Sequence, residues 1–85
     1  MNSYIIKSDG TITPYSPADE RAFTLKEMQK AVGGYVERVG THQNKGVWAN
    51  EEGRLKGLPV NEKASELCYR EIVGDVLVCP ENYVR

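Results

Sequence analysis

The chain opens with two short runs of β-branched and aromatic residues separated by a turn. These runs occupy residues 4–7 and 11–13, and Asp9-Gly10 lies between them. Asp-Gly accepts positive φ at both central positions of a tight turn, so the pattern predicts a β-hairpin. Pro14 and Pro17 interrupt regular strand pairing, and residues 15–21 are expected to form a loop.

A helical pattern follows. Apolar residues recur at three- and four-residue spacing after Thr24, and Thr24 stands three residues before Glu27, as in a capping box. Gly33 and Gly34 can adopt the left-handed conformation that ends a helix. We therefore predict a helix over residues 24–32 and then a strand over residues 35–39.

The pattern is less regular in the middle of the chain. Residues 40–46 are polar and are expected to form an exposed loop, and residues 47–49 resume a strand. Residues 50–55 are expected to turn, within either a second hairpin or an extended lobe.

The last third of the chain predicts one helix and one strand. Asn61 is a good N-cap for a short helix over residues 61–70. Residues 72–78 are the most hydrophobic segment, and the second half of this segment is expected to be a central strand buried on both faces.

Grouped strands with two helices indicate the α+β class. We expect a small curved mixed or antiparallel sheet with two short helices packed on one face, in a single domain over residues 1–85. The residues expected in the core are Leu25, Met28, Val32, Leu67, Val76 and Val78.

Composition and charge exclude several classes. The chain has 11 basic and 12 acidic residues, scattered singly, which argues against a nucleic-acid partner. Cys68 and Cys79 make no disulfide framework and lack the paired spacing of a zinc site. No apolar run approaches the roughly 18 residues that span a membrane, and the N-terminal residues lack the regions of a signal peptide. We expect a cytoplasmic protein without a membrane partner.

No set of residues predicts catalysis. The sole histidine, His42, lies in the polar loop, the serines have no nucleophile-elbow context, and no glycine-rich phosphate-binding motif occurs. We expect no catalytic residue, no bound metal and no cofactor, and therefore not an enzyme.

The candidate binding segment is 48–61, because its backbone is irregular between two elements that the core should hold, and loops on such scaffolds often bind. Acidic residues before Gly53 would steer a basic partner, and basic residues after it would face an acidic group or phosphate. The candidate site residues are Trp48, Glu51, Glu52, Arg54, Lys56 and Asn61.

Two of these residues have alternative interpretations. Trp48 is either a core anchor or an interface residue. Asn61 either caps its helix and does nothing else, or joins Arg54 and Lys56 in an anion site at the helix N-terminus.

Three blocks of the sequence resemble a known family. They are FTLKEMQ at 23–29 closed by VGGYVE at 32–37, NEEGRLKGLPVN at 50–61, and IVGDVLV at 72–78. In this order they resemble small uncharacterised domains of bacteriophages, plasmids and integrative elements of bacteria. The resemblance covers residues 4–80 and implies a mobile-element context in a bacterial host, but it transfers no chemistry to any residue.

Two functions of different classes are expected from these observations. The first is a phage or mobile-element accessory binding protein that occupies a host protein surface and antagonises a defence system without turnover. The alternative is a sponge that sequesters a small phosphorylated or nucleotide signalling ligand, with an oligomer interface as its pocket. A second copy of the chain is a further candidate partner, because self-association adds buried area to a small core.

Overall fold

The computed structural model describes residues 2–19 and 21–84, so Met1, Glu20 and Arg85 lie outside it. The elements are β1 (Tyr4–Ile6), β2 (Ile12–Pro14), α1 (Leu25–Val32), β3 (Val36–His42), β4 (Lys45–Asn50), α2 (Glu62–Cys68), β5 (Val76–Pro80) and a 3-10 turn, η1 (Glu81–Tyr83). The five strands form one sheet in the order β2-β1-β5-β4-β3, and each neighbouring pair is antiparallel. The α+β class is confirmed. Of the two expected forms of the sheet, mixed or antiparallel, the structure has the antiparallel one.

Strand β5 is the central strand, and both of its faces are buried. Leu77 lies opposite Ile5 of β1 and Trp48 of β4, and these three side chains share one hydrophobic cluster. Val78 lies opposite Val47 of β4, and these two belong to a second cluster. Because side chains alternate along a strand, the two clusters lie on opposite faces of the sheet.

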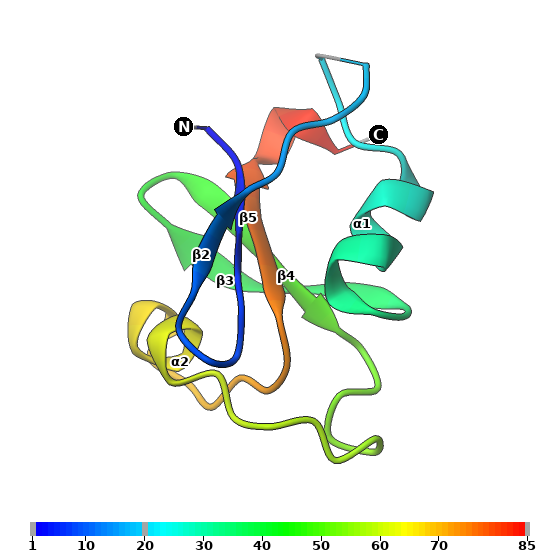
Figure 1. Ribbon diagram of the computed structural model, residues 1–85. Coiled ribbons are helices and arrows are strands. Elements are labelled where there is room, and N and C mark those ends of the chain that lie inside the picture. Colours follow the sequence, from blue (N-terminus) through cyan, green and yellow to red (C-terminus); the bar gives the residue numbers. More distant parts are fainter. Residues whose placement is uncertain (1, 20, 85) are drawn as a thin grey trace.

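The two helices cover opposite faces, so the expectation that both pack on one face is wrong. Helix α1 contributes Met28 and Val32 to the cluster around Leu77, and α2 contributes Ala64 to the cluster around Val78. Figure 1 shows α1 and α2 on either side of the sheet. The physical reason is that the apolar runs of β1, β4 and β5 expose hydrophobic side chains in both directions, so each face needs its own cover.

Helix α1 begins and ends where the sequence predicts. Thr24 accepts a hydrogen bond from the Glu27 backbone N–H, and the Glu27 carboxylate accepts one from the Thr24 N–H, which completes the capping box. Gly33 ends the helix in the left-handed region at φ 78°.

The loop expected over residues 40–46 is instead a tight hairpin between β3 and β4. Gln43 and Asn44 both have positive φ, 51° and 65°, and they connect the paired residues His42 and Lys45. Two central residues with positive φ match the twist of the flanking strands. The polar composition concealed the strands because β3 is an edge strand with several exposed positions.

Two of the expected core residues are less buried than the pattern predicted. Leu25 is 61% exposed at the first position of α1, and Leu67 is partly buried against the cluster around Val78. Met28, Val32, Val76 and Val78 are buried as predicted. Phe23 takes the place that Leu25 was expected to fill, because the chain that enters α1 turns its ring into the core, where it stacks on Tyr15 at 5.4 Å between ring centroids.

Asn61 is completely buried and does more than cap α2. Its side-chain oxygen accepts a hydrogen bond from the Ala64 N–H, which is the capping contact. Its side-chain N–H groups donate to the carbonyls of Ile6 and Gly74, each at 2.9 Å. One amide therefore joins β1, the entry to β5 and the start of α2.

The half-burial of Leu67 and the exposure of Leu25 predict different costs of truncation. Leu67→Ala should lower the free energy of unfolding by about 1–2 kcal/mol, below the range for a fully buried leucine, and Leu25→Ala by less than about 0.5 kcal/mol. Urea denaturation of both variants measures this. Equal losses would contradict the assignment of the exposed and core-facing positions.

Asn61 offers a second test, because aspartate keeps the capping oxygen but loses both donated hydrogen bonds. At pH 7, Asn61→Asp should be at least as destabilising as Asn61→Ala, at about 3–5 kcal/mol, since its carboxylate would face two buried carbonyl oxygens. Burial raises the pKa of such a carboxyl group, so stability should recover as the pH falls through that raised pKa. Thermal unfolding across pH measures both effects. If Asn61→Asp left the stability unchanged at pH 7, only the capping hydrogen bond would matter.

Candidate functional site

The predicted binding segment forms a compact run of turns, which is neither a hairpin nor an extended lobe. Within residues 51–57, the Lys56 N–H donates to the Glu52 carbonyl and the Gly57 N–H donates to the Arg54 carbonyl. We call residues 51–57 the turn segment. Its other backbone hydrogen bonds are local, but the Glu51 N–H donates to the Tyr35 carbonyl at 2.7 Å, so the start of the segment is tied to the chain just before β3.

Contacts with the rest of the fold hold both ends of the turn segment. At its start, the Asn50 side chain donates to the Val32 carbonyl at the end of α1 and accepts from the Glu52 N–H. After its end, Leu58 packs over Gly74, and the Gly74 N–H donates to the Pro59 carbonyl at 2.7 Å. The segment is thus an exposed surface element on a fixed base.

Two of the candidate site residues, Trp48 and Asn61, are buried and do not belong to the exposed surface. Trp48 is 7% exposed in the core cluster around Leu77, so it is a core anchor. Its ring covers Gly46, where a Cβ atom would lie 2.2 Å from the ring. Asn61 is fully buried, and Arg54 and Lys56 line different cavities, so the three are not assembled into one anion site.

The four charged candidates lie on the turn segment but do not form separate acidic and basic patches. Glu51 and Arg54 are exposed, while Glu52 lies 3.9 Å from Lys56 in an ion pair across one turn. Gly53 is buried against Val73. Opposite charges are therefore interleaved, which suits a partner of mixed charge more than a strongly basic or acidic one.

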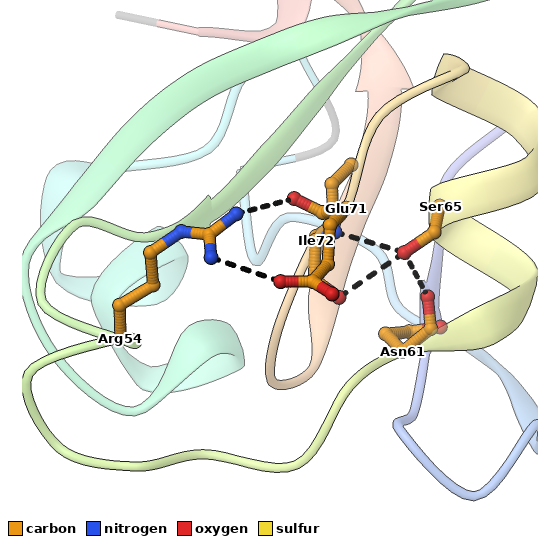
Figure 2. Close-up of polar contacts among 5 residues, drawn as sticks. All are labelled: Arg54, Asn61, Ser65, Glu71 and Ile72. Atoms are coloured by element: carbon orange, nitrogen blue, oxygen red, sulfur yellow. Dashed lines mark hydrogen bonds and ion pairs between the residues drawn. The ribbon is translucent and has the colours of Figure 1, made fainter.

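Arg54 connects the turn segment to the chain that follows α2. Its guanidinium donates to the Glu71 carboxylate at 2.9 Å and to the Glu71 carbonyl at 3.1 Å (Figure 2). On the other side, the Ile72 N–H donates to the Ser65 hydroxyl, which also lies 2.7 Å from the Asn61 carbonyl (Figure 2). Residues 71 and 72 are held between the turn segment and α2. The Arg54–Glu71 pair is exposed and contributes at most about 1 kcal/mol to stability, so its main effect is positional.

Two exposed apolar residues flank this connection, and sequence reasoning missed both. Leu55 is 88% exposed on the turn segment, and Tyr69 is 95% exposed at the C-terminal end of α2. Leu55, Arg54, Arg70 and Glu71 are among the residues that line a small hollow of about 90 Å³, and Tyr69 directly precedes Arg70 in the chain. We call Arg54, Leu55, Tyr69, Arg70 and Glu71 the 54–71 surface. Two sequence signals could have revealed these exposed residues. One is a lone leucine between two basic residues, and the other is a helix end without glycine.

Tyr69 occupies a strained conformation without any gain from burial. Its φ of 55° lies in the left-handed region, where a residue with a Cβ atom loses roughly 1 kcal/mol relative to glycine. Its side chain contacts little, since it is almost fully exposed. Folding alone would favour glycine here, so the tyrosine is a candidate for contact with another molecule.

A separate cavity of about 360 Å³ lies between the end of α1, residues 56–59 and the entry to β5. Lys30 and Lys56 contribute two ammonium groups to its lining. Asp75 also lines it, but its carboxylate accepts a hydrogen bond from the Ser8 N–H at 2.9 Å. The cavity is therefore polar and weakly basic.

The thiols and the histidine do not converge. Cys79 is buried in the cluster around Leu77, where burial raises the pKa of its thiol to about 12 and keeps it protonated. Cys68 packs on the opposite face of the sheet, where burial raises the pKa of its thiol and nearby Arg70 partly offsets that shift. Within residues 2–19 and 21–84, no three potential ligands gather to hold a metal ion. Neither α1 nor α2, nor any other helix in the described part, is long and apolar enough to cross a membrane.

Comparison with known proteins gives one match. Neither a search of curated proteins nor a search of solved structures found a match. A family model described as "Domain of unknown function (DUF3846)" matches residues 1–83, which is nearly the whole chain. The three sequence blocks on which the family resemblance rests lie within this match, and the chain belongs to the DUF3846 family of uncharacterised domains.

Proposed function

We propose that this chain is a non-catalytic binding protein that occupies a surface of another protein through its 54–71 surface. The observation that carries the proposal is the pairing of two nearly fully exposed apolar side chains, Leu55 and Tyr69, with a held Arg54–Glu71 contact between their segments. Tyrosine and arginine are enriched among the residues that dominate binding energy at protein interfaces. A fixed base lowers the entropy lost on binding.

The strain at Tyr69 supports a role in binding. A residue that costs stability and buries almost nothing in the free protein is retained for some gain elsewhere, and burial of its ring in a partner would supply that gain. Glu51, which lies just outside the 54–71 surface, would then act at the rim, where charges steer association and set its salt dependence.

The biological setting in this proposal comes from the family resemblance. The partner is a protein of the bacterial host, met in the cytoplasm, and the chain is an accessory product of a bacteriophage or mobile element. By covering a working surface of a defence protein, it would block that protein by steric competition, with no turnover.

Tyr69→Gly separates this function from stability. Because glycine relieves the left-handed strain, the free energy of unfolding should stay the same or rise by up to about 1 kcal/mol. Capture of the host partner by tagged protein should fall at least tenfold, as roughly expected when an aromatic interface residue is lost. Urea denaturation and quantitative mass spectrometry of captured proteins provide the two measurements.

Matched controls are available for this test. Leu55→Ser should reduce capture as Tyr69→Gly does, whereas Leu25→Ser and Tyr35→Ser change exposed apolar residues outside the 54–71 surface and should leave capture intact. If all four variants capture the same partner equally, the 54–71 surface is not the interface. A host whose defence is inhibited by the wild type should regain it with Tyr69→Gly.

The cavity lined by Lys30 and Lys56 favours a second candidate, the sponge for a small phosphorylated or nucleotide ligand. Two ammonium groups at one cavity suit phosphate oxygens, and a second copy could close its open side. Purified protein that acts in this way should release a nucleotide on heat denaturation, which liquid chromatography detects.

A Lys30→Glu, Lys56→Glu double variant should release far less nucleotide, and a Lys26→Glu, Lys45→Glu control should release the wild-type amount. Release of nothing from the wild type, together with capture of a host protein, would decide for the protein-binding function.

A further inference from the structure

The small hollow at the 54–71 surface extends onto the face of the sheet that carries α2. Three of its lining side chains, those of Val39, Ala49 and Ile72, are buried and apolar. Ala49 of β4 is opposite Glu37 of β3, and its small side chain leaves room beside that carboxylate. The volume of about 90 Å³ corresponds to about three water molecules, which is enough for the end of one side chain.

The charged side chains of the hollow do not cancel. Three carboxylates and two guanidinium groups line it, so one negative charge is in excess. The Arg54 guanidinium is paired with the Glu71 carboxylate, and the Arg70 guanidinium donates at 3.1 Å to a neutral acceptor, a backbone carbonyl of β3. Within residues 2–19 and 21–84, the other two carboxylates, Glu37 and Glu51, have no ion pair and accept no hydrogen bond.

Glu37 and Glu51 lie diagonally on the same face of the sheet. The Glu51 N–H donates to the Tyr35 carbonyl at 2.7 Å, so the β3–β4 pairing, in which Glu37 is opposite Ala49, continues to Glu51. Ala49 and Glu51 are two residues apart and therefore point to the same side. The Cα atoms of such a diagonal pair are about 7–8 Å apart, within reach of long side chains. The two carboxylates repel one another at this spacing, and a cation between them would remove that repulsion.

This combination of shape and charge specifies the occupant. A lysine or arginine side chain has an aliphatic stem that suits the apolar lining and Leu55, and a cationic end that suits Glu37 and Glu51. We propose that the hollow receives one basic side chain of the protein partner. This inference rests on the proposed function of the 54–71 surface and extends that surface to β3.

Three probes with the same four-carbon chain test the hollow without a partner: butylguanidinium, butanol and butyrate. Each is titrated into the full chain at constant ionic strength, and the amide chemical shifts are followed. Butylguanidinium should shift the amides of residues 37–39, 49–51 and 70–73 and bind at least about fivefold more tightly than butanol or butyrate, because only the cation is attracted. Equal binding of the three probes, or shifts confined to other regions, would overturn the proposal.

Matched variants assign the preference to the two carboxylates. Glu37→Gln combined with Glu51→Gln should abolish the preference for the cation. Glu62→Gln combined with Glu66→Gln removes two exposed carboxylates of α2 and should retain it. An equal loss in the two double variants would reveal a general charge effect and contradict the site.

Capture of the host partner separates this inference from the proposed function. Glu37→Lys combined with Glu51→Lys should reduce capture at least about tenfold with the urea midpoint unchanged, and Glu62→Lys combined with Glu66→Lys should leave capture intact. If Tyr69→Gly abolishes capture and the reversal at 37 and 51 does not, the proposed function stands and the basic anchor is wrong. Loss of capture in the reversal variant alone would support the anchor and exclude the contact at Tyr69. If neither change affects capture, both proposals are wrong.

Discussion

The burial of β5 on both faces is the constraint on which the rest of the fold depends. Four consecutive residues, Val76 to Cys79, are all buried, so their side chains require apolar cover in both directions. Antiparallel neighbours β1 and β4 satisfy its backbone, and α1 and α2 cover its two faces. An 85-residue chain has few apolar side chains to divide between two clusters. The helix that covers the face around Val78, α2, is short.

The buried amide of Asn61 helps to fix the elements on which the turn segment lies. It ties α2 to β1 and to the entry of β5, and the hydrogen bond between Asn61 N–H and the Ile72 carbonyl adds a backbone link beside it. Asn50 does the same at the other end of the segment by joining it to α1. Two buried asparagines, each with donors and acceptor used, therefore hold the exposed charges of residues 51–57 in place.

The proposed binding surface arises from a departure from ideal folding. On the 54–71 surface, Leu55 and Tyr69 are exposed although they are apolar, and Tyr69 is also strained, so the free protein gains little from either. Local rules that fail at particular residues mark places where contact with another molecule would complete the structure.

The sequence by itself determined the local events: the Asp9-Gly10 hairpin, both helix N-caps, the end of α1 at Gly33, and a doubly buried strand near the C-terminus. Each depends on residues close in the chain, through turn geometry, capping or periodicity. Only the tertiary structure decided that the helices take opposite faces, that Trp48 is buried and that Asn61 spans three elements. It also decided that Arg54 meets Glu71, and it left Leu55 and Tyr69 exposed on the two segments that this contact joins. These depend on pairs far apart in the sequence, whose meeting is set by strand order and register, which no local pattern encodes.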